Sequence, residues 1–390
     1  MTLNILIAPS GFKESLDAEQ VADCIANGIQ KVLKDVNIRK APLVDGGEGF
    51  TKTLVNVTGG TLHYLEVTGP VRQKIQSHFG FLGGCSVKTA VLEMAAAAGL
   101  RLVPPDLRNP LITTTYGVGE LIKAALDAGA ERILVGCGDS GTNDGGAGMA
   151  QALGVKLLDE NGSSIGLGGS ELIKLKQIDF SQRDPRLDNV VIDVACNWHN
   201  LLCGDRGVAK VFGPQKGASP EIVEQMALGL EHYAAVIAGD LGMDIGEMPG
   251  SGASGGLGTG LHALIGATLH PRYDIVMQYL ELDNLIPEVD LVITAEGCID
   301  FQTPRGKIPA EVAKRAKSYG LPVIALVGTV GEGAEINFQH GIDYFTSILT
   351  HPCGLNEAID QTATLLTDAA EQIARLLLVG KEIRRCTFTD

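Results

Sequence analysis

Hydrophobic positions near the start of the chain follow two patterns in turn. Residues 3–8 form an unbroken apolar run before a Pro-Ser-Gly sequence, which predicts a buried strand that ends in a loop. From Val21 to Leu33 the apolar residues recur at helical spacing, and Ser15 or Asp17 can cap this helix. A second strand leads to residues 42–44. A strand, a helix and a strand in this order indicate a parallel α/β sheet.

The pattern changes after Gly59-Gly60. Residues 61–68, 74–82 and 86–94 alternate or run apolar between Gly-Pro and Gly-Gly turns, as successive strands of hairpins do. A second, mixed domain is therefore expected to begin here. Its further predicted elements are helices at residues 113–128, 220–237 and 257–269 and strands at residues 132–135 and 190–195.

The parallel pattern returns near Ile286-Pro287. Apolar strands at residues 290–294 and 322–327 flank a helix at 309–318, and a long helix covers 355–378. A chain of 390 residues exceeds the roughly 250–300 at which single hydrophobic cores stop growing. We therefore expect a two-domain α/β fold. Residues 1–60 and 286–390 form a parallel-sheet, Rossmann-like domain, and residues 61–285 form an inserted mixed α/β domain.

Composition and charge narrow the function. Hydrophobic residues make up 45% of the chain and charged residues 20%, which describes a globular protein with a large core. The net charge of −15 argues against nucleic acid or an anionic membrane as a partner. An anionic substrate would have to be held by backbone N–H groups, a metal ion or a few placed cations. A further copy of the chain is left open as a partner.

The cysteines and the apolar runs bear on location. None of the eight cysteines forms a CxxC pair, so neither a zinc site nor a redox dithiol is indicated. No apolar run approaches the ~18 residues of a membrane span, and the start of the chain lacks the pattern of a signal peptide. A cytoplasmic location is expected.

Four glycine-rich loops are the main candidates for binding. The first is residues 45–49, the second 136–146, the third 249–258 and the fourth 212–217. Glycine allows backbone N–H groups to approach an oxyanion, and a following helix presents its positive end. One such loop is structural about as often as it is functional. Four of them, two very dense, favour a protein that handles phosphate.

The second loop also supports a different class. Gly136-x-Gly138-x-x-Gly141 follows a predicted strand, and Asp159 lies about twenty residues on, as in dinucleotide-binding proteins. This would indicate an NAD-dependent 2-hydroxy acid dehydrogenase. The polar residues that follow Gly141 and the short helix after them weaken it, and the same pattern recurs from Gly250 to Gly255. The GxxxxGK[ST] pattern of P-loop kinases is absent.

Carboxylates and cations lie at the ends of the predicted strands. Phosphoryl transfer uses carboxylates to hold magnesium and to position the attacking hydroxyl. Asp45 and Asp300 each follow a strand of the parallel sheet, where such folds bind ligands. Lys13, Arg305 and Lys307 follow strands of the same sheet and are expected to converge on one anion. Most lysines are solvated surface residues, and most loop carboxylates are caps.

Seven segments together resemble the glycerate kinase family of bacterial glycerate and glyoxylate metabolism. They are residues 8–13, 45–49, 113–121, 140–149, 212–218, 252–258 and 290–294, and they span nearly the whole chain in order. The resemblance implies two α/β domains with the active site in the cleft between them. It also implies ATP and Mg²⁺ as cofactors and (R)-glycerate as substrate, phosphorylated in most members at the 2-hydroxyl.

Three segments depart from the family pattern, one of them residues 195–200, where Ala-Cys-Asn-Trp-His-Asn replaces the more usual Ala-Cys-Asp-Val start. The family usually has Gly-Glu-Gly-Arg-Ile-Asp where this chain carries Cys298 in place of the arginine, and Arg305 is a candidate to replace that cation. The usual Asp-Ser-Phe-Lys begins here with Ser10, so an early carboxylate is missing. The reaction class is unaffected, but 3-phosphoglycerate stays open as the product beside 2-phosphoglycerate.

The residues and the resemblance give one hypothesis for the site. The second and third loops hold the nucleotide phosphates, Lys13, Arg305 and Lys307 bind glycerate and the transferring phosphoryl group, and Asp300 or Asp193 acts as base. The catalytic residues are then Asp45, Lys13, Asp193, Asp300 and Lys307, and the magnesium ligands come from Asp45, Glu48 and Asp144. The nucleotide-binding residues are Gly138, Ser140, Gly141, Thr142, Asn143, Gly252, Ser254, Gly255 and Gly256. A sensor that binds a nucleotide without turnover is the non-enzymatic alternative.

Overall fold

The computed structural model describes residues 2–12, 15–44 and 46–383. Its contacts divide the chain into two compact units. The terminal unit combines residues 1–44 with 276–390, and the inserted unit is residues 45–275. Sequence patterns predicted boundaries at residues 60 and 286. Residues 50–58 group with the inserted unit because helix α2 (Phe50–Thr58) packs on strands β3 to β5 of that unit.

The terminal unit is built on a parallel sheet, as predicted. Its strands lie in the order β13-β12-β11-β1-β2, and every neighbouring pair is parallel. Taken in chain order within this unit, this is the 2-1-3-4-5 order of doubly wound folds, with the reversal between β1 and β11. The strands are β1 (Leu3–Ile7), β2 (Val36–Lys40), β11 (Leu291–Ile299), β12 (Val323–Val330) and β13 (Tyr344–Ser347).

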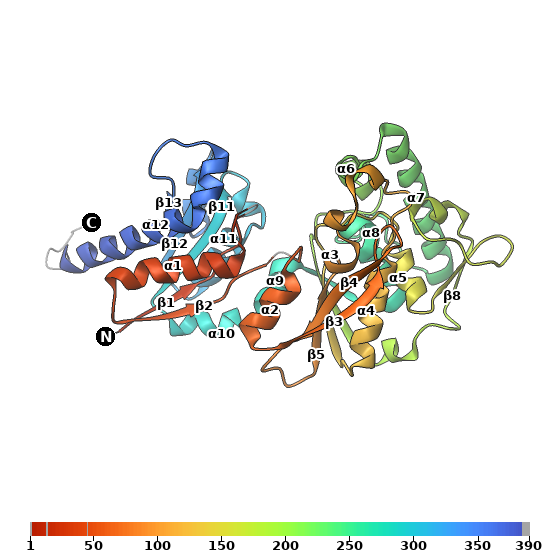
Figure 1. Cartoon of the computed structure of the whole chain (residues 1–390), viewed down its shortest axis with the longest axis horizontal. Helices are drawn as coiled ribbons and strands as arrows, with labels where there is room; N and C mark the ends of the chain where they lie inside the picture. Colours follow the sequence, from red (N-terminus) through yellow and green to blue (C-terminus); the bar gives the residue numbers. More distant parts are fainter. Residues whose placement is uncertain (1, 13–14, 45, 384–390) are drawn as a thin grey trace. The chain divides into compact units, whose positions relative to one another are not determined.

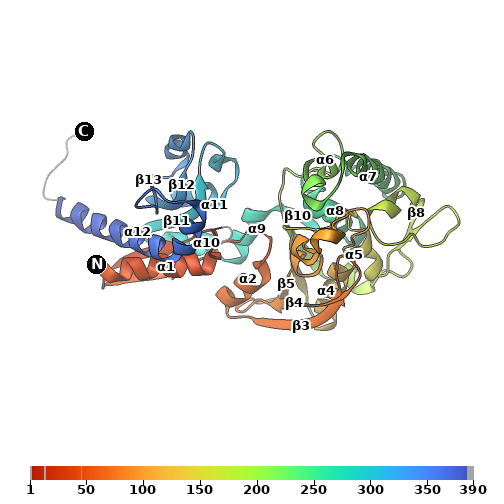
Figure 2. The same cartoon turned by 45° about the horizontal axis from the view of Figure 1, so that its top comes forward.

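Helices cover both faces of this sheet. On one face α1 (Ala18–Val32) lies beside α12 (Leu355–Ile383), as Figures 1 and 2 both show. A side chain at Gly28 of α1 would overlap the Thr367 carbonyl of α12, so the absent side chain lets the helices approach closely. The other face carries α11 (Ile308–Ser318), which packs on β11 and β12. Alternate strand residues such as Ile5 and Ile7 face the α1–α12 side.

The start of α1 illustrates how local sequence sets this unit. The Asp17 carboxylate accepts the backbone N–H of Gln20 at 2.8 Å, and the Gln20 side chain accepts the backbone N–H of Asp17 at 3.0 Å. This reciprocal capping box satisfies two N–H groups that a helix start otherwise leaves unpaired. Of the two caps predicted from sequence, Asp17 is the one used.

The inserted unit contains a mixed sheet in the order β10-β9-β6-β5-β4-β3. Strands β5, β6, β9 and β10 run parallel, and β3 and β4 add an antiparallel edge. The predicted hairpin strands are confirmed. The bounds are β3 (Thr61–Thr68), β4 (Lys74–Phe81), β5 (Thr89–Glu93), β6 (Arg132–Gly136), β9 (Val191–Cys196) and β10 (Thr268–Pro271); β7 (Lys156–Leu158) and β8 (Gln177–Asp179) form a separate antiparallel pair.

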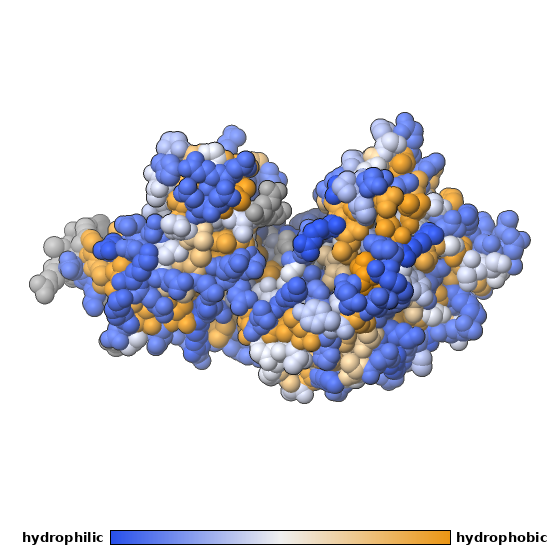
Figure 3. All heavy atoms as spheres, in the orientation of Figure 1, coloured by the Kyte–Doolittle hydropathy of each residue, from blue (hydrophilic) through white to orange (hydrophobic). Residues whose placement is uncertain are grey.

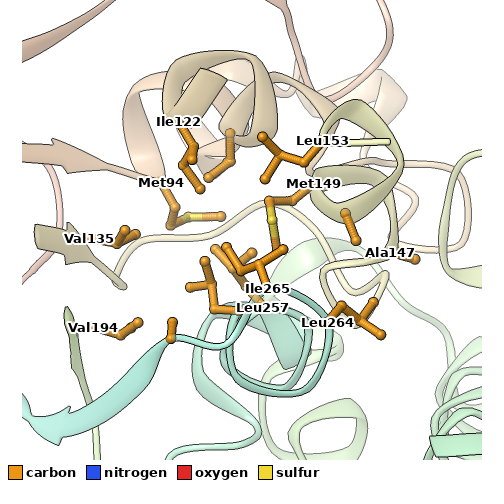
Figure 4. Packing of buried hydrophobic residues seen from close by; sticks show 14 of the residues in the cluster. Met94, Ile122, Val135, Ala147, Met149, Leu153, Val194, Leu257, Leu264 and Ile265 are labelled. Carbon is orange, nitrogen blue, oxygen red and sulfur yellow. The ribbon is translucent and has the colours of Figure 1, made fainter. Parts of the chain in front are cut away.

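Several helices pack on this sheet around one apolar core. Figure 4 shows part of that core, in which the buried side chains of Met94, Ile122, Met149, Leu257 and Ile265 belong to one apolar cluster. The helices are α3 (Ala95–Ala98), α4 (Tyr116–Asp127), α5 (Ala147–Ala152), α6 (Val208–Phe212), α7 (Pro220–Leu241) and α8 (Ala253–Thr259). Helix α9 (Arg272–Tyr279) spans the boundary after residue 275, and α10 (Leu282–Leu285) belongs to the terminal unit.

One predicted helix is wrong over part of its length. Residues 257–269 were expected to be a single helix, but α8 ends at Thr259 and is followed by a π-helical turn, Gly260–Leu264. Gly266, with φ of +80°, then redirects the chain, and β10 pairs with β9. Leu257, Leu261 and Leu264 are buried as their spacing implied. Burial of these side chains does not require the helix to continue, which is why the pattern overran its end.

The surface in Figure 3 is largely hydrophilic, as expected for a chain in which 20% of the residues are charged. Hydrophilic residues cover most of the face shown in Figure 3, with scattered apolar patches on each unit. Within the described residues, no helix is both long enough and apolar enough to cross a membrane.

Candidate functional site

The four glycine-rich loops of the sequence meet within the inserted unit. A Cβ atom on Gly138 of the second loop would lie 2.6 Å from Gly47 Cα of the first. The Gly145 N–H of the second loop donates to the Gly255 carbonyl of the third at 3.1 Å. From the fourth loop, the Lys216 ammonium reaches the second. Segments distant in the sequence therefore share one region of the fold.

Close packing between these loops accounts for many of their glycines. A side chain at Gly255 would overlap the Thr142 carbonyl, and one at Gly252 would overlap the Leu201 carbonyl. Gly255 and Gly256 also have φ of +72° and +86°, where other residues are strained. This explains the glycines without a ligand, and phosphate binding by the loops stays a prediction. Of the nine predicted nucleotide-binding residues, Gly138 is half-buried and Ser140, Gly141, Thr142, Asn143, Gly252, Ser254, Gly255 and Gly256 are buried.

Asp144 does not fit the predicted role of magnesium ligand. Its side chain is fully buried, and its carboxylate accepts hydrogen bonds from the Thr115 N–H and hydroxyl, the Thr114 hydroxyl and the N–H groups of Gly146 and Gly148. Burial raises the pKa of Asp144 in spite of these donors. The carboxylate holds the second loop to the start of α4, so a magnesium ion could bind only by displacing that network.

Lys216, in the fourth loop, is a buried lysine that the predicted site did not include. Its ammonium donates to Ser140 Oγ at 2.8 Å and to the Thr142 carbonyl at 2.6 Å, and the residue is 2% exposed. Burial lowers the pKa of Lys216 to about 7, and the negative charge of Asp144 offsets only part of this. Its place between Pro214 and Gly217, in a tight turn, was the available signal. Lys216 thus holds the second loop in place through hydrogen bonds to two of its residues.

A cavity of about 630 Å³ opens beside the first and second loops. Glu48 and Asp139 line it, and the Glu48 N–H donates to Asp139 Oδ2 at 2.9 Å. The Glu48 carboxylate forms an ion pair with Arg101, which also lines the cavity. Glu48 is 44% exposed and therefore remains accessible as an oxygen ligand. The other charged lining residues are Lys52, Glu93 and Arg108.

Glu93 is a second residue that sequence reasoning missed. It ends β5 and is 2% exposed, and its carboxylate accepts the N–H groups of Gly49 at 3.0 Å and Thr51 at 2.7 Å. Burial raises the pKa of Glu93, and the two N–H donors oppose that rise. The arrangement fixes the first loop where it enters α2. An acidic residue at the end of a buried strand was the signal for it.

Asp193 has structural partners that argue against its predicted role as base. It lies within β9, and its side chain is 4% exposed. Arg132 Nε of β6 donates to its carboxylate at 2.8 Å, and His270 Nε2 of β10 lies 2.8 Å from the other oxygen. The three residues connect three neighbouring strands. A carboxylate engaged on both sides has no open oxygen for a substrate hydroxyl.

Asp300 and Lys307, two of the predicted catalytic residues, lie in contact in the terminal unit. Asp300 directly follows β11, and its Oδ1 lies 3.2 Å from the Lys307 ammonium and accepts the Gln302 N–H at 2.9 Å. Burial alone would raise the pKa of Asp300, but the Gln302 N–H and the Lys307 charge outweigh it and hold the pKa below its ordinary value. Both side chains are partly exposed, at 21% and 29%. The carboxylate is therefore ionised at neutral pH and open to a ligand.

Of the remaining residues singled out near the strand ends of this unit, the structure describes Arg305 and Ser10. Arg305 is exposed, and its guanidinium lies 5.8 Å from the Phe301 ring centroid. The Ser10 hydroxyl, at the position of the missing carboxylate, donates to the Ala295 carbonyl at 3.0 Å and so joins the loop after β1 to the middle of β11. Lys13 and Asp45 lie outside the described residues, and their roles stay predictions.

The terminal unit has its own cavity, also of about 630 Å³. It lies where the carboxyl ends of β1, β11 and β12 meet the first turns of α12. Its described lining comprises Gly11, Phe12, Ser15, Glu296, Gly297, Cys298, Lys307, Gly328, Thr329, Ile348, Leu349, Cys353, Gly354, Leu355, Ala358, Ile359 and Thr362. Of the predicted substrate-binding residues, Lys307 is thus in a cavity wall.

The dinucleotide-binding alternative is inconsistent with the topology. In that motif the strand that carries the acidic residue lies parallel in the same sheet as the first strand. Here Asp159 follows β7, which pairs only with the antiparallel β8 outside the main sheet. The Asp159 carboxylate accepts the N–H groups of Asn161 and Ser163 and so closes its own turn. The helix after the second loop, α5, has only six residues.

Metal ligands are not gathered in the described part of the chain. Among residues 2–12, 15–44 and 46–383, no three His, Cys, Asp or Glu side chains form a group that could hold a metal ion. The seven cysteines in these ranges are unpaired thiols.

Several similar sequences are described as glycerate kinases. Residues 5–378 match the profile of the glycerate kinase family. A glycerate kinase from Halalkalibacterium halodurans is 47% identical over 370 residues, which cover 95% of this chain and 97% of that protein. The glycerate 2-kinase of Escherichia coli is 45% identical over 378 residues, which cover 97% of this chain and 99% of that protein.

A solved structure resembles the whole fold. A crystal structure from Salmonella typhimurium LT2, described as a candidate glycerate kinase 2, superposes with a TM-score of 0.85 at 43% sequence identity. The match covers 98% of this chain and 100% of that one. The predicted α/β fold class is thereby confirmed over nearly the entire chain.

Proposed function

Since the chain belongs to the glycerate kinase family, we propose that it transfers the terminal phosphoryl group of ATP to (R)-glycerate, giving ADP and 2-phosphoglycerate. The observation that carries this is the 45% identity, over 378 residues, to the glycerate 2-kinase of Escherichia coli. Such identity along both units supports the same reaction and the same acceptor hydroxyl.

Phosphoryl transfer depends mainly on positioning and on stabilisation of charge. The hydroxyl oxygen of glycerate forms a bond to the γ-phosphorus while the bond from that phosphorus to the bridging oxygen of ADP breaks. We assign the hydroxyl proton to Asp300, whose carboxylate is ionised, partly exposed and oriented by Lys307. Lys307 and Arg305, with Lys13, supply the positive charge that the transferring group needs in a chain of net charge −15.

Asp193 is left out of this machinery. Its ion pair with Arg132 and its contact with His270 occupy both carboxylate oxygens. Asp45 stays in the proposal, since it begins the first loop.

Magnesium fits only part of the predicted ligand set. Mg²⁺ commonly takes one or two protein carboxylates and completes its shell with waters and substrate phosphates. Glu48, with its exposed carboxylate, and Asp45 are suited to this, whereas Asp144 is not. The ion, bound with ATP, would neutralise phosphate oxygens.

A coupled assay tests the reaction. Purified chain, ATP, Mg²⁺ and (R)-glycerate should release ADP, and omission of glycerate should abolish the release. Phosphorus NMR of the product should show the secondary phosphate ester of 2-phosphoglycerate. A primary ester would instead assign the 3-hydroxyl, and reduction of NAD without ATP would overturn the proposal.

The proposal extends to location and partners. The seven unpaired thiols suit a reducing compartment, which together with the use of ATP supports the cytoplasm. The net charge of −15 supports small-molecule partners, glycerate and ATP, over nucleic acid or an anionic membrane. Self-association is open to measurement by light scattering.

A further inference from the structure

The cavity of the terminal unit lies at the topological switch point of its sheet. Gly11 and Phe12, which line it, follow β1, and residues 296–298 form the end of β11. From β1 the chain proceeds to β2 on one side, and the sheet continues from β11 on the other. In doubly wound sheets, ligands bind in the crevice outside the carboxyl ends of the strands at this reversal. The position alone therefore indicates a ligand site.

The lining of this cavity is largely apolar. Phe12, Ile348, Leu349 and Ile359 contribute hydrocarbon surface from three separate segments. Among its described lining residues, Glu296 and Lys307 alone carry a charge. A ligand that fits here presents a broad apolar face and one negatively charged end.

The cavity of the inserted unit is lined by more charged side chains. Its described lining includes six charged side chains, namely Glu48, Lys52, Glu93, Arg101, Arg108 and Asp139. A flat aromatic ring would have to strip water from several of these groups, which is costly unless each finds a partner. Of the two cavities, the one in the terminal unit suits a nucleobase.

The charged end of the terminal cavity suits a phosphate. Lys307 immediately precedes α11, an eleven-residue helix, and its ammonium lies 3.2 Å from Asp300 Oδ1. The positive end of a helix and an adjacent ammonium both attract phosphate oxygens. The Asp300 carboxylate, which the proposed reaction uses, would then lie close to the transferring group.

We propose that this cavity binds the adenosine part of ATP, with the phosphate chain extending towards Lys307. The inference rests on the proposed function, in which ATP is the phosphoryl donor. The nucleoside is then bound in the terminal unit and not at the second and third loops, whose predicted binding residues are mostly buried against each other.

Two thiols in the cavity wall provide a test that needs no turnover. Cys298 and Cys353 line the cavity, whereas Cys85 is exposed in the inserted unit. ADP at ten times its calorimetric Kd should slow N-ethylmaleimide alkylation of Cys298 and Cys353 about 10-fold, measured by peptide mass spectrometry. The rate at Cys85 should not change. ADP binding without protection of the two cavity thiols would overturn the proposal.

A matched pair of variants gives the second test. Ala358 lines the cavity from α12, whereas Asn356 is exposed on the same helix and does not line it. Ala358→Trp should raise both the Kd for ADP and the KM for ATP about 10-fold or more, by steric exclusion, with the KM for glycerate little changed. Asn356→Trp should leave all three values unchanged. Equal affinities for ADP in Ala358→Trp and the parent chain would contradict the inference.

The experiments test the proposed reaction and the proposed nucleotide site independently of each other. If ADP protects the thiols but ATP and glycerate give no product, the proposed reaction is wrong and the nucleotide site stands. If product forms but the thiols stay unprotected, the reaction stands and the nucleotide binds elsewhere. Should Ala358→Trp lose its cooperative melting transition, thiol protection of the unaltered chain still decides.

Discussion

Asp300 and Lys307 form the one pair of predicted catalytic residues that the described structure brings into contact. Their separation of 3.2 Å lets the ammonium keep the carboxylate ionised, and the Gln302 N–H fixes its orientation. Asp193 is also ion-paired, but it is buried between strands. We infer that the same residue type serves two purposes, the proposed base at Asp300 and a structural ion pair at Asp193, and that exposure distinguishes them.

Replacing each aspartate by asparagine separates these purposes. Asp300→Asn should lower kcat by about 10²–10⁴-fold, because an amide cannot accept the hydroxyl proton. Asp193→Asn should instead cost about 1–3 kcal/mol of stability, because it weakens the hydrogen bonds of a buried carboxylate while Arg132, 36% exposed, keeps contact with water. Steady-state kinetics and urea unfolding measure the two effects. If Asp193→Asn lowered kcat as much as Asp300→Asn does, the assignment of Asp300 as the base would be wrong.

Lys216 makes stability depend on pH in a defined direction. Its pKa is about 7 in the folded chain, against roughly 10.4 in an unfolded one. Between these values the unfolded chain binds more protons, so the free energy of unfolding rises as pH increases.

From pH 7 to 8.5, the free energy of unfolding should increase by about 1–2 kcal/mol relative to Lys216→Met. The methionine variant keeps the length of the side chain without a titrating group, so other ionisations cancel in the comparison. Urea unfolding at both pH values provides the measurement. Parallel curves for the two proteins would show that Lys216 keeps its ordinary pKa.

At the scale of elements, the contact between the second and third loops depends on the absence of side chains. Gly255 has φ of +72°, and a side chain there would overlap the Thr142 carbonyl. Gly239, within helix α7, has open space around its Cβ position and no such backbone strain. The two glycines therefore differ in what an added methyl group would meet.

Gly255→Ala should destabilise the chain by about 3 kcal/mol or more, from backbone strain and the displaced loop. Gly239→Ala should instead stabilise it by about 0.5–1 kcal/mol, because alanine is the better helix former. The midpoints of urea unfolding give both values. Equal stability of the two variants would mean that the loops are not packed together in solution.

Element patterns in the sequence predicted most of the fold. Unbroken apolar runs identified β1, β11 and β12, because strands buried on both faces leave no polar position. The helix at residues 257–269 was overextended, because the burial of Leu257, Leu261 and Leu264 does not reveal where a glycine turns the chain.

The candidate site was harder to predict than the fold. Asp144, Glu93 and Lys216 interact with backbone groups supplied by other loops, and no local pattern specifies which loops meet. Asp300 and Lys307 were predicted because they share one strand-to-helix connection. Nearness in sequence, more than chemical type, decided which contacts between candidate residues could be expected from the sequence.

On the scale of the whole molecule, one unit is formed by a continuous stretch of the chain and the other by two separate stretches. The inserted unit is continuous, from residue 45 to 275, and contains its own apolar core. The terminal unit needs both chain ends, because β1 pairs with β11 on one side and β2 on the other. Removing the first segment would therefore leave the centre of that sheet unpaired.

A fragment of residues 45–275 should unfold cooperatively on heating and show near-ultraviolet circular dichroism, as a packed core requires. A fragment of residues 276–390 should lack both signals. Adding a peptide of residues 1–44 should restore them, because it supplies β1, α1 and β2. Cooperative unfolding of residues 276–390 alone would show that β1 is dispensable to that unit.

The discontinuous terminal unit has a consequence during synthesis. Residues 1–44 leave the ribosome first, but their strand partner β11 follows only after the inserted unit has been made. At about 5–20 residues per second, those roughly 230 residues take on the order of 10–50 s. For that interval the apolar strand β1 and one face of α1 have no native partner from the other end of the chain. The nascent protein thus exposes an aggregation-prone segment, and its yield in cells should depend on chaperones that bind such segments.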